Sequence, residues 1–591
     1  MTKNLLEKVS TPEKLRALDQ QELPALAAAL RAYIIETLAQ NEGHLGASLG
    51  TVELTMVLHY VFDTPRDLLV WDVGHQAYAH KILTKRKTAF KTLRQAGGMS
   101  GFPSRQESPY DTFGTGHAGT SLSAVLGMAL ATNLQHKNRH HLAVIGDASL
   151  ASGMALEALN HLATTQTNVL VVLNDNSMGI DPSVGALKNH FKKLQKEGNK
   201  TKHLALFDLP YVGPVAGHNL PQLLATFKAE KEKSGPRLVH VITTKGKGLE
   251  AAEKNQIQFH APGKFDPLTG KLQKQTLEEK IKFQHVFGEA LLSLAKDNSK
   301  IVAITPAMPT GSGLIPFMKE FPDRCFDVGI AEQHAVTLAA GLASQGMLPF
   351  CVVYSTFLQR AYDQLIHDVA LQNLPIVFCI DRAGLVGHDG ATHHGVFDIA
   401  FLRCIPNITL LAPRNASVLR NMLYTASLSL KGPLAIRYPR GVTPEDSPLT
   451  PFEKIDYRQM ELLSKGKDIA VISVGTLVEN VAVACSQTQN PEAFAHFDLQ
   501  CIKPLDRITL KSIFKAYKAV IIVEEGVVQG GAGSAVMESM HALGCQIPCY
   551  LMGVPDEFIA HGPNAVLKAQ VGLDPKSITK KLNSIWEKHS N

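Results

Sequence analysis

The chain of 591 residues has few aromatic residues and little net charge. Aromatic residues make up 6% of the sequence, only two of them are tryptophan, and the formal net charge is +6. The basic runs at residues 81–91 and 188–202 contain a single phenylalanine each and therefore no aromatic stacking platform. These absences argue against nucleic-acid binding. We expect both runs to form solvated faces, and residues 188–202 to form a mobile or functional loop.

Cysteine is missing from the first half of the chain. All eight cysteines follow residue 320, most of them inside apolar, strand-like runs that are typical of small core residues. Cys545 and Cys549 have no second pair at zinc-binding spacing. We therefore expect neither disulfides nor structural zinc.

Long apolar runs are missing as well. No run reaches the length of a membrane span, and no apolar signal segment or cleavage site follows Met1. We expect a cytoplasmic protein without membrane contact. A hydrophobic content of 45% and a charged content of 19% are typical of globular proteins, and the length suggests about three or four domains.

Residues 142–180 carry the most informative local pattern. An apolar run at 142–145 ends at Gly146-Asp147, and after a helix-like segment a second run at 169–173 ends at Asn174-Asp175-Asn176. This order predicts two neighbouring parallel strands with Asp147 and Asn176 at their C-terminal ends, where open α/β sheets bind ligands. A carboxylate and an amide oxygen there favour Mg²⁺. A helix-capping aspartate and a turn asparagine would give the same pattern.

Glycine-rich loops precede several predicted helices in the same region. They lie at residues 43–50, 74–78 and 114–121. Backbone N–H groups and the helix dipole at such helix starts suit a diphosphate. One loop of this kind is weak evidence, but several in one domain with Asp147 and Asn176 indicate a diphosphate and metal site.

The alternation of strand-like runs and helical segments restarts twice. Residues 255–280, rich in proline, glycine and lysine, indicate a linker, and a proline cluster around 445–465 indicates a second boundary. We predict an α/β protein of three consecutive domains with mostly parallel sheets, at residues 1–270, 281–450 and 465–591.

Longer motifs, in order over nearly the whole chain, resemble one family. They read TVELT at 51–55, WDVGHQAY at 71–78, GD at 146–147, NDN at 174–176, DVGIAEQHA at 327–335, YSTFLQRAYDQ at 354–364, DRAG at 381–384, DGATHHG at 389–395 and RYPRG at 437–441. On these motifs the chain resembles the 1-deoxy-D-xylulose-5-phosphate synthase family, thiamine diphosphate enzymes of the transketolase superfamily. Transketolase and the pyruvate dehydrogenase β subunit share the general pattern, but not the 71–78 stretch together with the 354–364 stretch.

The resemblance implies a transketolase-like fold and an enzyme. The first domain would bind diphosphate, the second the aminopyrimidine ring, and the third would support a homodimer. The implied reaction joins pyruvate to D-glyceraldehyde 3-phosphate, with loss of CO₂, for isoprenoid, thiamine and pyridoxal synthesis. The implied cofactors are thiamine diphosphate and Mg²⁺. The alternatives are transketolase-type ketol transfer between sugar phosphates and cofactor binding without catalysis.

The resemblance also assigns site residues. The protonated carboxyl group of Glu332 would donate a hydrogen bond to the aminopyrimidine, because its apolar neighbours favour a raised carboxyl pKa. The metal would take Asp147, Asn176 and the backbone carbonyl of Met178. Further cofactor contacts would come from His75, Gly116, His117, Ala118, Ala148, Ser149, Lys245 and Phe357. The histidines near the reacting carbon would be His44, His75, His260 and His393, and the acceptor pocket would hold Tyr354, Arg360, Arg382, Asp389, His393 and Arg440.

These assignments have plainer alternatives. Glu332 could cap an exposed first turn, Phe357 could be a core residue, and Lys245 could be a surface lysine in a basic turn. Histidines are by default structural in a chain that has 24 of them, and the arginines could form interdomain salt bridges. The GGAG loop at 530–533 resembles a nucleotide cradle without the full fingerprint, so we expect the third domain to be structural.

Three departures from the family pattern stand out. Ala148 stands where the family has glycine, and Ala118-Gly119 stand where it has a serine pair. An added methyl or a lost hydroxyl would weaken cofactor binding by about 1 kcal/mol, the value of one hydrogen bond. The segment after Pro182 is also shorter than is usual in the family.

Overall fold

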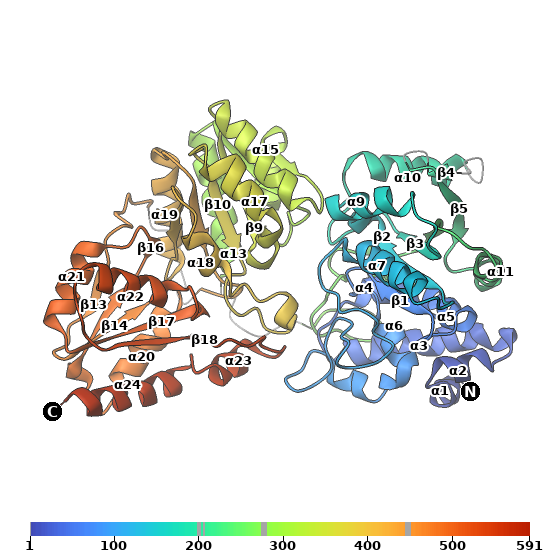
Figure 1. The fold of residues 1–591 in the computed structure, drawn as a ribbon, viewed down its shortest axis with the longest axis horizontal. Helices are drawn as coiled ribbons and strands as arrows, with labels where there is room; N and C mark the ends of the chain where they lie inside the picture. The colour runs from blue at the N-terminus through green and yellow to red at the C-terminus, as the bar shows by residue number, and fades with distance from the viewer. Residues whose placement is uncertain (1, 198–202, 205–206, 274–280, 444–450, 591) are drawn as a thin grey trace. The chain divides into compact units, whose positions relative to one another are not determined.

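The computed structural model of the chain describes residues 2–197, 203–204, 207–273, 281–443 and 451–590. It divides into two compact units, the first made of residues 1–276 and 329–331 and the second of residues 277–328 and 332–591. Each unit contains mostly parallel sheets with helices packed on them (Figure 1). The predicted α/β fold class is confirmed.

The first unit is built on a six-stranded sheet with the order β1-β2-β3-β6-β5-β4. All its strand pairs are parallel except β4 with β5. The strands are β1 (Leu68–Trp71), β2 (His141–Gly146), β3 (Val169–Asp175), β4 (His203–Leu204), β5 (Leu209–Ala216) and β6 (Arg237–Ile242). Strands β2 and β3 pair in parallel, with Gly146 opposite Asn174, which confirms the neighbouring strands predicted within residues 142–180.

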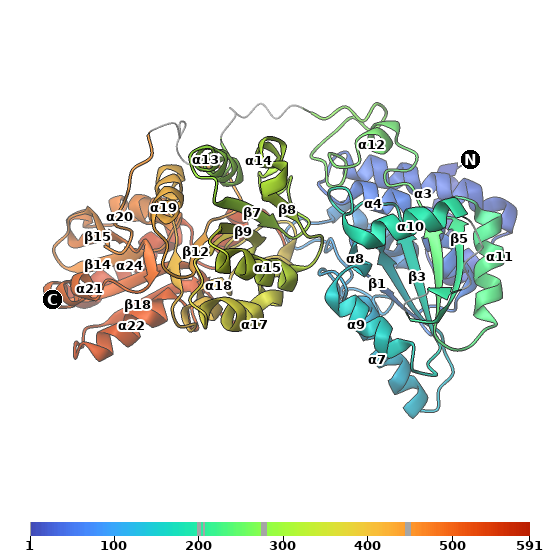
Figure 2. The same ribbon diagram turned by 90° about the horizontal axis from the view of Figure 1, so that it is seen from above.

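Helices cover both faces of this sheet, because alternate strand residues point to opposite sides. Leu142 and Val144 pack into one core cluster, and Ala143 and Ile145 into another. Figure 2 shows α7 and α9 on one side of the strands and α3 and α11 on the other. The helices are α1 (Thr2–Lys8), α2 (Pro12–Arg16), α3 (Leu23–Leu38), α4 (Leu45–Gly50), α5 (Val52–Val61), α6 (Tyr78–Lys81), α7 (Thr120–Leu134), α8 (Asp147–Leu150), α9 (Gly153–Leu162), α10 (Gly185–Glu197), α11 (Leu220–Lys231) and α12 (Glu250–Lys254).

Each basic run differs from its predicted structure only in part, since several of its lysines are exposed as expected: Lys85, Lys91, Lys192, Lys193 and Lys196. Lys81 is fully buried, because its ammonium donates to Glu107 at 2.7 Å and to the carbonyl of Ser100 at 2.9 Å. The second run is helical up to Glu197 in α10, where Phe191 and Leu194 pack into the core, so the predicted loop is wrong for this part. Residues 198–202 lie outside the described residues.

The predicted linker at residues 255–280 is wrong for its first part. Phe259 and Phe265 are buried in the core of the first unit, where their rings make an edge-to-face contact with centroids 6.1 Å apart. Two buried aromatic residues tie residues 255–273 to this unit, because each removes a large apolar area from water. Residues 274–280 lie outside the described residues.

The second unit contains two sheets, with the orders β16-β11-β12-β10-β9-β7-β8 and β13-β15-β14-β17-β18. All pairs are parallel except β11 with β16 and β13 with β15. The strands are β7 (Ile301–Thr305), β8 (Cys325–Asp327), β9 (Leu348–Tyr354), β10 (Val377–Asp381), β11 (Thr409–Leu411), β12 (Leu434–Arg437), β13 (Glu461–Ser464), β14 (Ile469–Ser473), β15 (Phe494–Asp498), β16 (Cys501–Lys503), β17 (Ala519–Val527) and β18 (Cys549–Val554).

The two sheets of this unit share one hydrophobic core. Phe378 of β10 and Ile472 of β14 belong to the same buried cluster, and β16 adds a strand from the C-terminal segment to the seven-stranded sheet. The five-stranded sheet has α20 and α24 on one side and α21 and α22 on the other (Figure 1). The helices are α13 (Phe283–Asp297), α14 (Ile315–Glu320), α15 (Glu332–Ser344), α16 (Ser355–Leu358), α17 (Tyr362–Gln364), α18 (Asp398–Arg403), α19 (Ala416–Leu428), α20 (Leu477–Ser486), α21 (Arg507–Ala516), α22 (Ala532–Ala542), α23 (Asn564–Gln570) and α24 (Pro575–His589). The bounds of the three predicted domains stay a prediction.

The eight cysteines are all free, and five of them are buried. Burial raises the pKa of the Cys351 thiol to about 12, which suits a core residue rather than a nucleophile. Within the described ranges, no helix combines the length and the apolarity that crossing a bilayer would need.

Candidate functional site

The predicted site residues divide between the two units. The first unit contains His44, His75, Gly116, His117, Ala118, Asp147, Ala148, Ser149, Asn176, Met178, Lys245 and His260. The second contains Glu332, Tyr354, Phe357, Arg360, Arg382, Asp389, His393 and Arg440.

Asp147 and Asn176 lie together at the C-terminal ends of β2 and β3. The backbone N–H of Asn176 donates to Oδ1 of Asp147 at 3.4 Å, and the Ser183 hydroxyl donates to Oδ2 at 2.7 Å. The Asn176 side-chain oxygen accepts from the N–H of Met178 at 3.1 Å, in the turn that follows β3. Two of the predicted metal ligands therefore lie in this turn, and the third, Asp147, lies at the end of β2. Burial and the nearby Asp175 raise the pKa of Asp147 to about 7. A bound cation would supply the missing positive charge.

Lys245 is a buried residue rather than a surface lysine. Its ammonium donates to the carbonyl of Gly179 at 2.7 Å and to that of Ile180 at 3.4 Å. Burial lowers the pKa of Lys245 to about 8, although the carboxylates of Asp181 and Asp147 act in the opposite direction. Lys245 therefore faces the turn that follows Asn176.

His44, His75 and His260 form a triangle. Their ring centroids are 5.8 Å apart for His44 and His75, 5.5 Å for His44 and His260, and 5.6 Å for His75 and His260. Burial and Lys245 lower the pKa of His75 to about 3, so this imidazole is uncharged near neutral pH. Among the described residues, no hydrogen-bond partner meets the buried Nδ1 of His75. Three histidines that lie up to 216 positions apart in the sequence are thus brought together.

A carboxylate of the protein itself occupies the N-terminus of α7, next to the predicted loop at 114–121. Oδ1 of Asp72 accepts from the N–H of Gly119 at 2.9 Å, and Oδ2 accepts from the N–H of Ser121 at 3.0 Å. These two donors, which the glycine-rich loop was expected to offer to a ligand, are already used.

The same arrangement closes the GGAG loop in the second unit. The Glu524 carboxylate accepts from the N–H of Ala532 at 2.7 Å and from that of Gly533 at 2.8 Å, at the start of α22. Burial raises the pKa of Glu524 to about 7 even though these two donors favour the charged form. A phosphate would have to displace this carboxyl group, which agrees with the structural role expected for the segment.

Glu332 is the first residue of α15, and its side chain is buried. An exposed capping glutamate is therefore the wrong interpretation. Burial raises the pKa of Glu332, and the nearby Arg360 offsets this only in part. Within the described part of the chain, Oε2 has no hydrogen-bond partner. A buried carboxyl oxygen without a partner costs free energy unless a ligand satisfies it.

Tyr354, Phe357, Arg382 and His393 form one cluster around the ends of β9 and β10. The rings of Tyr354 and Phe357 are stacked with centroids 5.8 Å apart, and those of Phe357 and His393 meet edge to face at 5.6 Å. The Arg382 guanidinium lies over the Tyr354 ring, 4.0 Å from its centroid. Arg440 donates to the carbonyl of Val386 at 3.2 Å and pairs with Asp389 at 3.4 Å. The second unit thus contains a cluster of aromatic and basic side chains.

Asp381 is a residue of this region that sequence reasoning did not assign. It ends β10 opposite Tyr354, and burial raises its pKa to about 7 despite Arg382 and Arg440. Its Oδ1 accepts from the N–H of Arg382 at 2.6 Å, whereas Oδ2 lacks a hydrogen-bond partner among the described residues. The signal was available, because Asp381 follows a predicted parallel strand as Asp147 does.

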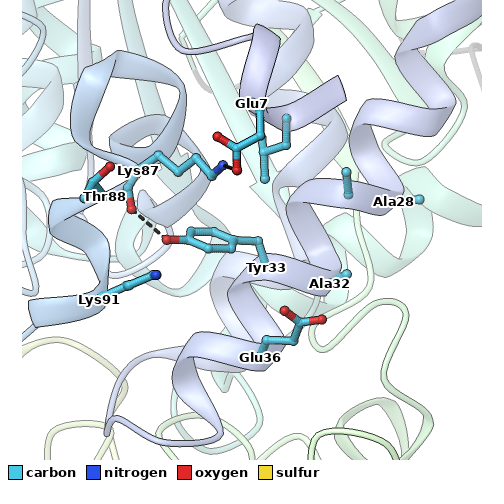
Figure 3. A pocket seen from close by; sticks show the side chains of 10 residues that line it. Glu7, Ala28, Ala32, Tyr33, Glu36, Lys87, Thr88 and Lys91 are labelled. Atoms are coloured by element: carbon cyan, nitrogen blue, oxygen red, sulfur yellow. Dashed lines mark hydrogen bonds and ion pairs between the residues drawn. The ribbon is translucent and has the colours of Figure 1, made fainter. Parts of the chain in front are cut away.

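A surface cavity of about 370 Å³ lies elsewhere in the first unit, between α1, α3 and residues 87–91 (Figure 3). The hydroxyl of Tyr33 donates to the carbonyl of Lys87 at 2.7 Å, and the Lys87 ammonium pairs with Glu7. None of the predicted site residues lines it. The predicted chemistry therefore does not involve this cavity.

Comparison with known proteins gives consistent matches over the whole chain. A family model described as 1-deoxy-D-xylulose-5-phosphate synthase matches residues 6–207 and 198–243. Models of the transketolase pyrimidine binding domain and the transketolase C-terminal domain match residues 279–445 and 458–578. The 1-deoxy-D-xylulose-5-phosphate synthase of Cytophaga hutchinsonii is 47% identical over 98% of this chain and 98% of its own length. Those of Paraburkholderia phymatum and Bacteroides thetaiotaomicron are 46% and 45% identical, over 100% and 98% of this chain and 98% and 96% of their own lengths.

These relatives contain residues that this chain lacks. The alignment with the Cytophaga protein spans 624 positions, more than the 591 residues of the chain. The two pieces of the first family model meet at residues 198–207, a short distance after Pro182.

Proposed function

The chain belongs to the 1-deoxy-D-xylulose-5-phosphate synthase family, and we propose that it joins pyruvate to D-glyceraldehyde 3-phosphate, with loss of CO₂. The product would be 1-deoxy-D-xylulose 5-phosphate, a precursor of isoprenoids and, we propose, of thiamine and pyridoxal. The observation that carries this proposal is the 47% identity over 98% of both chains with a relative of that name. Transketolase-type ketol transfer, the alternative, is a property of the wider superfamily.

The residues of both units fit the cofactor that family membership implies. Thiamine diphosphate, when bound, supplies a nucleophilic carbon and an electron sink. Asp147, Asn176 and the carbonyl of Met178 would hold Mg²⁺, since all three offer the oxygen ligands that this ion prefers. The diphosphate would be contacted by Lys245, Ala148, Ser149 and residues 116–118. The rest of the cofactor would be contacted by His75 and Phe357. The buried, unpartnered Oε2 of Glu332 supports a ligand at that carboxyl.

Glu332 would act as a proton-bearing donor toward the aminopyrimidine ring. Its raised pKa favours the protonated form, which can donate a hydrogen bond. The apolar surroundings keep water away from this oxygen, so the donor is held for its ligand.

The three histidines of the first unit would handle the pyruvate part of the reaction. An uncharged imidazole can donate from one nitrogen and accept at the other, so His75 can hold a carboxylate or an alkoxide and still pass a proton. His44 and His260 flank it at ring distances below 6 Å and would share this task.

The basic residues of the second unit would bind the acceptor. A planar guanidinium binds a phosphate dianion through two parallel N–H bonds, a geometry that Arg382 and Arg440 can provide. His393 would move a proton at the acceptor aldehyde or hydroxyl, next to Phe357. Tyr354, Arg360 and Asp389 would complete this pocket. A homodimer and a cytoplasmic location, both implied by the resemblance, stay predictions.

The experiment that tests the proposed function is an assay of CO₂ release from pyruvate with saturating thiamine diphosphate and Mg²⁺. We expect release that requires D-glyceraldehyde 3-phosphate. Transfer of a two-carbon unit from xylulose 5-phosphate, without CO₂, would instead establish the ketol transferase. A complete lack of turnover with either donor would favour the remaining alternative, a protein that binds the cofactor without catalysis.

Replacing Arg440 by methionine should raise the KM for D-glyceraldehyde 3-phosphate about thirtyfold, because a charge-assisted hydrogen bond contributes about 2 kcal/mol. The KM for pyruvate should stay within a factor of two (roughly). With unphosphorylated D-glyceraldehyde as acceptor, variant and wild type should become alike, since the group that Arg440 binds is absent. A matched control is Arg403→Met, which removes an arginine paired with Glu538 in the same unit. An equal loss with both acceptors would contradict the assignment.

Replacing Ala148 by glycine should tighten thiamine diphosphate binding about fivefold, equivalent to about 1 kcal/mol. The methyl group of Ala148 lies near Gly179, since a Cβ added at Gly179 would meet it at 3.5 Å. We propose that this methyl group crowds the diphosphate. Titration calorimetry in Mg²⁺ measures the Kd. Ala151→Gly, at the end of the same short helix α8, serves as control. An unchanged Kd in the Ala148 variant would show that the methyl group is harmless.

A further inference from the structure

Glu53, in the TVELT motif, has no part in the proposed chemistry and yet holds an arginine and a histidine side chain. It is a buried residue of α5. Its Oε2 pairs with Nη2 of Arg31, which comes from α3, and lies 3.1 Å from Nδ1 of His218, which follows β5. Burial would raise the pKa of Glu53, but His218 and Arg31 outweigh it and lower the pKa below 4.5. The carboxylate is therefore charged near neutral pH.

Both partners of Glu53 extend to the backbone of the same turn. Nε2 of His218 accepts from the N–H of Thr244 at 2.9 Å. Because Nε2 accepts, the proton of a neutral ring must be on Nδ1, where it is donated to Glu53. Nε of Arg31 donates to the carbonyl of Lys247 at 2.9 Å. The two ends of the turn at residues 244–247 are thus fixed by side chains that Glu53 orients.

The turn lies so close to α4 that glycine is needed at the contact. The N–H of Gly246 donates to the carbonyl of Gly46 at 2.8 Å. A Cβ at Gly50 would approach the carbonyl oxygen of Thr244 to 3.0 Å, and one at Gly46 would approach that of Phe259 to 2.9 Å. The Lys245 side chain is the part of the turn that packs against Gly46, where an added Cβ would meet its Cγ at 3.3 Å. Elsewhere backbone lies directly on backbone, so the position of the turn also depends on the hydrogen bonds at its two ends.

The turn carries Lys245, whose ammonium donates to the carbonyls of Gly179 and Ile180. These carbonyls directly follow Met178, a predicted metal ligand. A continuous series of contacts therefore runs from Glu53 through Arg31 and His218 to the turn, and from Lys245 to the proposed metal site. Residues that orient ligands in this indirect way are retained because the site geometry depends on them.

We propose that Glu53 is a positioning residue: through Arg31 and His218 it fixes the turn at residues 244–247 and so places the Lys245 ammonium beside the metal and diphosphate side of the site. The effect on cofactor binding rests on the proposed function. The effect on the turn itself does not, because it concerns contacts within the chain alone.

The first test uses hydrogen–deuterium exchange of the cofactor-free protein, read by mass spectrometry on the peptide that covers residues 243–249. Glu53→Ala should speed its exchange about tenfold, because the N–H of Thr244 loses a fixed acceptor. Glu53→Gln keeps the shape and one acceptor oxygen and should give an intermediate rate. A peptide from β3 should exchange as in wild type in both variants.

A matched control is Glu230→Gln in the same unit. Glu230 is also a buried glutamate, and it pairs with Arg237 at 3.3 Å and with Lys233 at 2.5 Å, but these contacts do not reach the turn. It should leave exchange of the 243–249 peptide unchanged. If Glu53→Ala fails to fold by circular dichroism, Glu53→Gln carries the comparison.

The second test measures thiamine diphosphate binding by calorimetry in Mg²⁺, together with steady-state kinetics. Glu53→Ala should weaken the Kd about tenfold, as is usual for residues that orient ligands. At saturating cofactor its kcat should stay within a factor of two (roughly), because the bound cofactor restores the turn. Wild type that does not bind the cofactor would reject the proposed function and leave the exchange result to decide on the turn. Unchanged exchange in both folded Glu53 variants would overturn the positioning role.

Discussion

Glu332→Ala should lower turnover at saturating thiamine diphosphate about a thousandfold while the protein stays folded. The carboxyl group is buried, its pKa is raised by burial, and its Oε2 meets no partner among the described residues. We propose that this carboxyl group acts on a bound ligand. Its removal should therefore affect the reaction far more than the fold. Single-turnover kinetics with pyruvate measures the loss at the chemical step.

The stability of the same variant gives an independent check. A buried carboxyl oxygen without a partner destabilises the folded state, so removing it should leave Tm unchanged or raise it, despite the small cavity. Glu332→Gln, which keeps an N–H donor at nearly the same place, should recover part of the activity. A structural glutamate would behave in the opposite way, with a large fall in Tm and a modest change in kcat.

Asp147→Asn should weaken Mg²⁺-dependent binding of thiamine diphosphate about a hundredfold or more, because it removes the only charged ligand of the proposed metal site. The shape is nearly kept, and an asparagine oxygen can still accept from Ser183. Calorimetric titration at several Mg²⁺ concentrations separates metal affinity from cofactor affinity. We expect the deficit to shrink as Mg²⁺ is raised.

Asp175→Asn is the matched control for that variant. Asp175 lies on the same strand end, but its carboxylate is taken by His240 at 2.9 Å, by Gln195 at 2.7 Å and by the N–H of Ser177 at 3.0 Å. Its loss should lower Tm and change the cofactor Kd far less than Asp147→Asn does, because Asp175 acts on the proposed site only through its charge near Asp147. Equal effects of the two variants on binding would reject Asp147 as a specific metal ligand.

Local patterns in the sequence were sufficient wherever a side chain and its partner lie within one βαβ unit. Asp147 and Asn176 could be placed together because parallel strands joined by one helix bring their ends to the same edge of the sheet. The first residue of α15 could be placed at Glu332 because an acidic residue in a first turn is favoured by the helix dipole.

Predictions failed where the partner lies further along the chain or where charged residues mask a local spacing. The sequence predicts an exposed Lys81, because the residue that pairs with its ammonium group, Glu107, lies in another loop. The 188–197 segment reads as a loop because its lysines hide the spacing of Phe191 and Leu194, which places both on one face of α10. The triangle of His44, His75 and His260 could be proposed from resemblance only, since no local period relates residues so far apart.

The carboxylate of Asp72 at the start of α7 bears on how the protein is supplied with its cofactor. If the product feeds thiamine synthesis, as proposed, a cell short of thiamine must assemble this enzyme before it can replenish the compound that the enzyme needs. Asp72 supplies acceptors for the N–H groups of Gly119 and Ser121 from within the chain, so these two donors need no bound diphosphate. We infer that the start of α7 keeps both hydrogen bonds in a newly made chain that has not yet met its cofactor.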